Sequence, residues 1–152
     1  MAKACQLFSG CSGNSIYIGN NSGGVLVDIG VSARRCEYAL NRICVSPENL
    51  KAVFVTHEHS DHISGIRVFA SKFNIPVFAA PETMEELRRT GTVNDKINGF
   101  DIDKSLEIGA FGVEAFRNSH DSSACLGYKF TMPDGRRISV CTDTGYVTDD
   151  AK

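Results

Sequence analysis

One short segment concentrates the side chains that could do chemistry in this chain: His57-Glu58-His59-Ser60-Asp61-His62. In extended backbone, residues two apart project to the same side, so His57, His59 and Asp61 can converge on one locus. His62 follows at a helix start and can reach a second, adjacent locus. Imidazole and carboxylate groups are good ligands for zinc, and they also suit iron or manganese. The segment therefore predicts a metal site, because polar surface loops seldom place so many such ligands together.

Two further candidate ligands lie in later loops. His120 is the only histidine outside the first segment, and it follows a predicted strand. Asp143 follows another predicted strand, over residues 138–142, and its carboxylate could bridge two metals. Asp before Thr144-Gly145 also commonly makes a simple turn, so this motif alone leaves both interpretations open.

The elements that must position these residues are short strands alternating with helices. Residues 4–8, 15–18 and 24–29 are β-rich runs separated by Gly, Ser and Asn turns, which predicts an antiparallel meander. The first separating loop, residues 9–14, is either a structural hairpin turn or a nest of backbone amides for a phosphate. Ser32 is placed to cap a helix whose apolar residues follow helical spacing and which ends before Pro47.

A strand over residues 51–56 leads into the histidine segment, and a second helix is expected from there to about residue 74. A strand over 76–80 and a helix over 81–89 follow, the helix opened by Pro81 and stopped by Gly91. Strands are expected over 108–117, 126–132 and 137–142, with a Pro-Asp-Gly turn between the last two. This order predicts an α/β (α+β) fold, a mixed sheet with flanking helices.

Composition places the chain among globular proteins. Its 152 residues, 42% hydrophobic and 22% charged, fit one domain. No apolar run is long enough to span a bilayer or to form a leader, so we expect a soluble cytoplasmic protein. The six cysteines are scattered and form no Cys-x-x-Cys pair, which favours reduced thiols. A net charge of -2 with dispersed basic residues neither indicates nor excludes nucleic-acid binding.

The pattern His57-x-His59-x-Asp61-His62, preceded by an apolar strand and Thr56, resembles the signature of metallo-β-lactamase-fold hydrolases. The resemblance extends to Ser9-Gly10-Cys11-Ser12-Gly13-Asn14-Ser15, Val27-Asp28-Ile29-Gly30, Ser119-His120-Asp121 with Gly127-Tyr128, and Thr142-Asp143-Thr144-Gly145-Tyr146. In that order and spacing these motifs are similar to the YycJ (WalJ) group, implicated as DNA exonucleases.

The resemblance implies an αβ/βα sandwich that carries a binuclear metal site. Its implied ligands are His57, His59 and His120 for one metal ion, Asp61 and His62 for the other, and Asp143 shared between the two. β-Lactamases of this fold usually lack equivalents of His62 and Asp143, so the presence of both favours a binuclear hydrolase. Asp28 would be a buried carboxylate that orients a ligand, with a cap on a turn as its alternative role.

The implied function is hydrolysis of a phosphodiester by a DNA exonuclease that uses a hydroxide bridging two divalent metal ions. Zinc is the first choice of metal, with manganese and iron as alternatives. Asp61 is the candidate catalytic residue, because it could accept a proton from the attacking water, although ligand duty is its simpler role. The alternatives are a glyoxalase II-like thioesterase or other small-ester hydrolase, and a non-catalytic metal-binding fragment.

The family pattern continues past Asp143 with further strands and helices and with a last histidine of the second metal site. We therefore expect residues 1–152 to form one metallo-β-lactamase domain, truncated before its C-terminal half. Loss of that half should uncover an apolar sheet face, which soluble monomers seldom tolerate over a large area. The expected partners are a nucleic-acid substrate, no membrane, and either the missing half or a second copy of the chain covering the exposed face.

Overall fold

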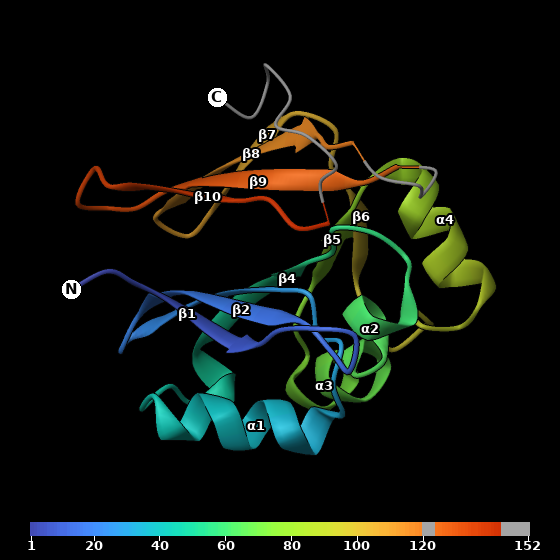
Figure 1. Cartoon of the computed structure of the whole chain (residues 1–152), viewed down its shortest axis with the longest axis horizontal. Coiled ribbons are helices and arrows are strands. Elements are labelled where there is room, and N and C mark those ends of the chain that lie inside the picture. The colour runs from blue at the N-terminus through green and yellow to red at the C-terminus, as the bar shows by residue number, and fades with distance from the viewer. Residues whose placement is uncertain (120–123, 144–152) are drawn as a thin grey trace.

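Three layers make up the fold in the computed structural model, which describes residues 1–119 and 124–143 (Figure 1). Helices α1 and α3 lie under one face of a six-stranded sheet, and a four-stranded sheet covers its other face. The helices are α1 (Ala33–Arg42), α2 (Ser60–Ile63), α3 (Ile66–Phe73) and α4 (Pro81–Arg89), with a 3-10 turn at Pro47–Asn49. None of the helices in the described part of the chain has the length and hydropathy that a membrane span requires.

The six-stranded sheet is mixed, in the order β1 (Lys3–Phe8), β2 (Ser15–Asn20), β3 (Gly23–Val27), β4 (Leu50–Phe54), β5 (Val77–Ala79) and β6 (Gly99–Asp101). The first three strands pair antiparallel, which confirms the predicted meander. From β3 onwards the strands are parallel. Because the carboxyl ends of parallel strands meet at one edge, the segments after β3 and β4 come together there.

The four-stranded sheet is antiparallel, in the order β10 (Arg137–Val140), β9 (Leu126–Thr131), β8 (Phe111–Arg117) and β7 (Ser105–Ile108). Its inner side chains, such as Val113, Tyr128 and Phe130, pack on Phe54 and Phe78 of the larger sheet. The strand predicted over 108–117 corresponds to β8 and starts later than expected, because Gly109 turns the chain at a φ of 59°; β7, before that turn, was not predicted. The predicted Pro-Asp-Gly turn lies between β9 and β10.

Local signals predicted α1 and α4 well. The Ser32 hydroxyl accepts a hydrogen bond from the Arg35 backbone N–H (3.4 Å), as expected of an N-cap. The helix is shorter than predicted and ends at Arg42, because the chain turns through a left-handed residue at Cys44 (φ 60°). The second predicted helix is wrong as one element and forms α2 and α3 instead.

Tertiary contacts break that helix at Gly65. The Gly65 N–H donates to Ile29 O (2.9 Å), and Asp61 O, its partner in a continuous helix, accepts from Asn14 N instead (2.8 Å). A Cβ at Gly65 would lie 2.0 Å from Val31 O, so only glycine allows this close approach. The break separates the short α2, which carries His62, from the packed helix α3.

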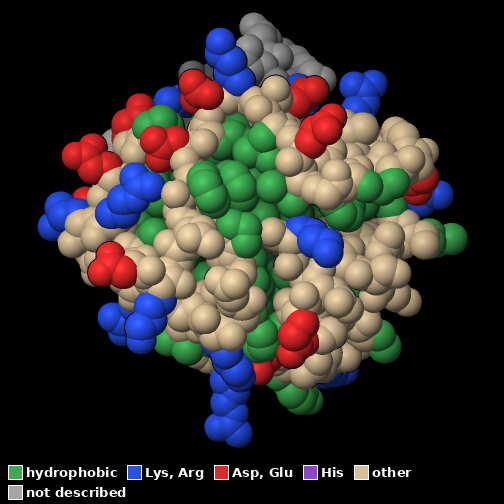
Figure 2. Space-filling model, turned by 180° about the vertical axis from the view of Figure 1, so that it is seen from behind, with side chains coloured by type: hydrophobic (Ala, Val, Ile, Leu, Met, Phe, Trp, Pro, Cys, Tyr) green, Lys and Arg blue, Asp and Glu red, His purple; other side chains and the backbone are tan. Residues whose placement is uncertain are grey.

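The outer face of the four-stranded sheet is polar, and the expectation that a missing half uncovers an apolar sheet face stays a prediction. Two rows of paired residues cross its strands: Ser105, Glu114, Lys129 and Ser139 in one, and Glu107, Gly112, Thr131 and Arg137 in the other. Seen from behind, hydrophobic side chains gather in the middle of the molecule (Figure 2). Among the described residues only four large hydrophobic side chains are classed as exposed, including Phe100 on the edge strand β6 (50% exposed).

Candidate metal site

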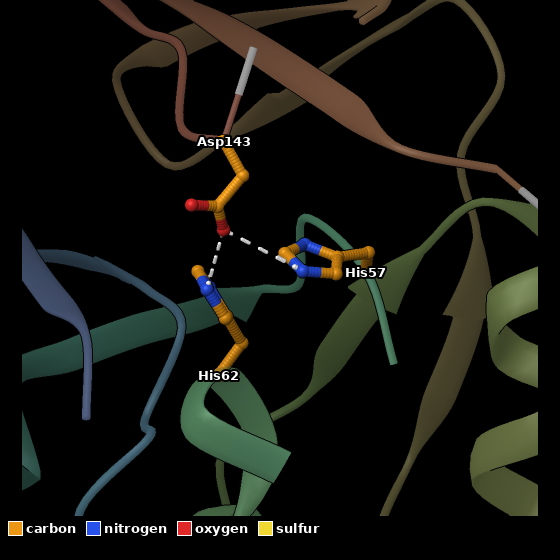
Figure 3. A group of neighbouring side chains, drawn as sticks. All are labelled: His57, His62 and Asp143. Atoms are coloured by element: carbon orange, nitrogen blue, oxygen red, sulfur yellow. Dashed lines mark ion pairs between the residues drawn. The ribbon is translucent and has the colours of Figure 1, made fainter. Parts of the chain in front are cut away.

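Three predicted ligands come together at the edge where the segment after β4 meets the end of β10 (Figure 3). Asp143 Oδ2 lies 2.7 Å from His62 Nε2 and 3.6 Å from His57 Nε2. The ligand atoms of all three residues lie within 4.8 Å of one another. His57 and His62 are buried, whereas Asp143 is exposed. Two imidazoles and a carboxylate in this arrangement are a donor set that suits a divalent cation such as zinc.

Asp28 and Thr56 hold the two histidine rings from behind. Asp28 Oδ2 lies 2.7 Å from His62 Nδ1 and accepts a second hydrogen bond from the Thr56 hydroxyl (2.7 Å). Since that hydroxyl donates to Asp28, its oxygen accepts from His57 Nδ1 (2.9 Å). In the neutral form of each ring, this network places the proton on Nδ1 and leaves Nε2, the nitrogen that faces Asp143, available to a cation. Asp28 therefore orients the ring of His62, a candidate ligand, as well as forming a turn at φ 61°.

Charge around His62 favours its protonated form. Burial alone lowers the pKa of His62, but the hydrogen bond and charge of Asp28, with the charges of Asp143 and Asp61, outweigh it and raise that pKa. Burial raises the pKa of Asp28 as well, against the hydrogen bonds that it accepts. A proton and a metal cation compete for the same nitrogen of His62, so the acidic groups that raise the pKa also favour a bound cation.

The remaining predicted ligands in the first segment lie beside this cluster. The His59 ring packs edge-on against His57, with ring centroids 4.6 Å apart, and it is exposed. Asp61 Oδ2 is 3.5 Å from His62 Nε2. His59 lies beside His57. The spacing alone grouped Asp61 with His57 and His59, whereas in the structure its carboxylate borders His62, the residue with which the family resemblance pairs it. His120 lies outside the described residues, and the full ligand assignment stays a prediction.

Asn14 is a residue of the site that the sequence argument did not single out. Its Nδ2 lies 3.2 Å from Asp61 Oδ2 and 3.3 Å from His62 Nε2, and it also contacts Gly10 O (3.0 Å). The loop over residues 9–14 is therefore more than a hairpin turn, because its last residue borders the ligands. The glycine-rich composition of the loop was the available signal, but it pointed to backbone amides rather than to this side chain.

The position of Asp143 depends on a second asparagine that sequence reasoning missed. Asn118, after β8, donates from Nδ2 to Thr142 O (2.7 Å), and its backbone N–H donates to Cys125 O (2.8 Å). Asp143 itself takes a left-handed conformation with φ 51°, which Asp tolerates better than most residues. Asp143 thus forms the expected turn and also belongs to the cluster with His57 and His62.

Residues 24–152 match the family model described as the beta-lactamase superfamily domain. The chain belongs to this superfamily. Exodeoxyribonuclease WalJ of Streptococcus pneumoniae is 39% identical over 151 residues, covering 97% of this chain and 56% of that protein. Exodeoxyribonuclease YycJ of Bacillus anthracis is 36% identical over 149 residues, covering 96% and 56%. The chain thus spans little more than half the length of these beta-lactamase superfamily relatives.

Solved structures agree on the fold of this superfamily member. A metallo-beta-lactamase with a HARLDQ motif from Cronobacter sakazakii superposes with a TM-score of 0.72 at 16% identity, over 83% of this chain and 56% of that one. The MIM-2 metallo-beta-lactamase superposes with a TM-score of 0.69 at 19% identity, over 86% and 55%. The predicted fold class is confirmed. This fold implies divalent metal ions, and the cluster of His57, His62 and Asp143 offers suitable ligands.

Proposed function

We propose that this chain carries the metal-binding part of a phosphodiesterase that degrades DNA from an end. The names of its relatives in Streptococcus pneumoniae and Bacillus anthracis support this substrate, since both are called exodeoxyribonucleases. The site supports the reaction type, because a cluster of imidazoles and carboxylates suits metal-assisted hydrolysis and needs no protein nucleophile.

The observation that carries the proposal is the position of Asp143, whose Oδ2 faces His57 and His62 at once. In the assignment we propose, these two histidines serve different metal ions and Asp143 is shared. The full proposed set is His57, His59 and His120 for one ion, Asp61 and His62 for the other, and Asp143 for both. Zinc is the metal we propose first, because nitrogen and carboxylate ligands suit it.

When bound, divalent ions in such a site acidify a water molecule and neutralise charge on phosphoryl oxygens. The residues of the chain have distinct tasks around that chemistry. Asp28 and Thr56 keep Nε2 of both histidines facing the site. Asp61, whose carboxylate borders His62, is positioned to accept a proton.

The six free thiols support the proposed cytoplasmic location, because disulfides persist mainly in oxidising compartments.

The proposal is tested with end-labelled single- and double-stranded DNA, after the purified protein has been stripped with a chelator and reloaded with zinc or manganese. We expect metal-dependent release of nucleotides from an end, lost in His62→Ala and kept in Arg137→Ala on the outer sheet face. A thioester substrate belongs in the same panel. Hydrolysis of the thioester alone would replace the nuclease with a thioesterase, and full metal loading without turnover would favour a metal-binding role.

A further inference from the structure

A second polar pocket opens one residue away from the candidate ligands. It has a volume of about 270 Å³ and is lined by residues of α2 and α3 and of the segment after α4. Its lining consists of Glu58, Ser60, Ile63, Ser64, Arg67, Thr90 and Thr92. The volume falls just below the roughly 300–1,000 Å³ of pockets for drug-sized ligands, so it suits one nucleotide or base better than a duplex.

Glu58 gives this pocket a carboxylate oxygen that can accept a hydrogen bond from a ligand. Its Oε2 is shielded from solvent and finds no hydrogen-bond partner among the described residues. Shielded polar atoms of this kind are usually hydrogen-bonded in folded proteins, so an unmatched carboxylate oxygen points to a donor from outside the chain. Glu58 lies between His57 and His59 in the sequence, so the pocket adjoins the segment that carries these candidate ligands.

Arg67 supplies the opposite charge in the same pocket. It lies on α3, is exposed, and forms no ion pair within the described ranges 1–119 and 124–143. A guanidinium binds phosphate well through paired N–H donors. The pocket therefore combines a cation for a phosphate, an acceptor for N–H groups, and hydroxyls from Ser60, Ser64 and Thr92 that can donate or accept.

We propose that this pocket binds one nucleotide of the DNA strand and prefers guanine, with Arg67 on a phosphate and Glu58 on the base. The inference rests on the proposed nuclease function. Guanine is the one DNA base that presents two neighbouring N–H donors, N1–H and N2–H, on its pairing edge, and a carboxylate accepts both. Adenine, cytosine and thymine each place an acceptor beside their donor there, which repels a carboxylate.

The test is equilibrium binding of the four deoxynucleoside 5′-monophosphates to the metal-free protein in excess chelator, followed by calorimetry or NMR shifts. We expect dGMP to bind about tenfold more tightly than the other three. Glu58→Gln should abolish that preference, because an amide presents one donor and one acceptor, whereas Arg67→Ala should weaken all four nucleotides by a similar factor. Glu107→Gln and Arg137→Ala on the outer sheet face are matched controls that should change nothing.

Equal affinity for the four nucleotides, no binding of any, or a preference retained in Glu58→Gln would each overturn the inference. A urea unfolding curve for each variant shows whether a loss of binding is only a loss of fold. Because the binding assay needs no metal and no turnover, it separates this inference from the proposed function. A guanine preference in a protein without nuclease activity would support the binding pocket and reject the nuclease. Nuclease activity without a guanine preference would support the nuclease and reject the binding pocket.

Discussion

Replacing Asp28 with asparagine tests how the candidate site controls its ligands. Asp28 is buried, with 1% of its surface exposed, and accepts hydrogen bonds from Thr56 N, the Thr56 hydroxyl and His62 Nδ1. Its backbone is left-handed, at φ 61°, a conformation that asparagine also tolerates. Asp28→Asn therefore keeps the size and backbone of the residue and removes one acceptor oxygen together with the charge.

The expected effect follows from where the new amide group lies. If the asparagine oxygen keeps the bond from Thr56 N, its NH₂ group takes the place of Oδ2, 2.7 Å from His62 Nδ1. That nitrogen must then accept, so the ring proton moves to Nε2, the atom that faces Asp143. Loss of an orienting carboxylate typically lowers metal affinity about 10- to 100-fold, or roughly 1.4–2.8 kcal/mol.

Metal affinity is measured by competition with a chromophoric zinc chelator, and folding by urea unfolding of the metal-free protein. The free energy of unfolding should fall by no more than about 1–3 kcal/mol, because the lost hydrogen bonds are partly offset by relief of a buried charge. Asp134→Asn, in an exposed turn, is the matched control. Zinc affinity within a factor of about two of the wild type, in a folded Asp28→Asn protein, would refute the tautomer argument, since that argument requires at least about tenfold.

Three further perturbations follow from the same structure. Thr56→Val removes the hydroxyl that links Asp28 to His57, so the free energy of unfolding measured in urea should fall by about 1–3 kcal/mol. An unchanged unfolding curve would contradict the hydrogen-bond network of Asp28, Thr56 and His57. Gly30→Ala places a Cβ 1.6 Å from Asp61 O, so it should destabilise the protein and weaken zinc binding, whereas Gly112→Ala places a Cβ at an ordinary 3.4 Å from the Thr131 Cβ and serves as the control for crowding. Burial raises the pKa of Cys36 to about 12, so this thiol should resist alkylation at about pH 8 while exposed Cys44 reacts, as mass spectrometry can show.

The raised pKa of Cys36 also fixes the sign of a pH effect on stability. The folded state holds the thiol proton more tightly than the unfolded state, so the contribution is fully present below the unfolded thiol pKa of about 8.5. It is lost progressively as the pH rises from there towards about 12, the pKa of the folded state. The free energy of unfolding should therefore decline across this alkaline range, and Cys36→Ala should reduce the decline.

Local signals in the sequence predicted much of the fold. The N-cap at Ser32, and Pro81 and Gly91 at the two ends of α4, act within a few residues and were predicted correctly. β6 reads Gly-Phe-Asp, without the apolar run that marks the equally short β5, and was missed. The break at Gly65 depends on Asn14, which lies far away in the sequence, so no local rule anticipates it.

In the candidate site, too, local signals predicted some residues, whereas the roles of others depend on contacts between distant parts of the chain. The types and spacing of His57 and His62 were sufficient to predict them as candidate ligands, and the structure brings both to Asp143, while their assignment to two adjacent loci stays a prediction. The roles of Asn14 and Thr56 arise from contacts across 47 and 28 positions of the chain, which only the folded sheet edge brings together. Threonine and asparagine are common residue types, so the type alone does not signal a site.

Metal stoichiometry shows whether the chain holds two metal ions that share Asp143. The protein is saturated with zinc, dialysed, and analysed by mass spectrometry of its elements alongside Asp143→Ala and the exposed control Asp134→Ala. We expect about two zinc ions per chain in the wild type and the control, the number a shared-carboxylate site holds, and fewer in Asp143→Ala. No bound zinc in the wild type, or an unchanged content in Asp143→Ala, would contradict this expectation.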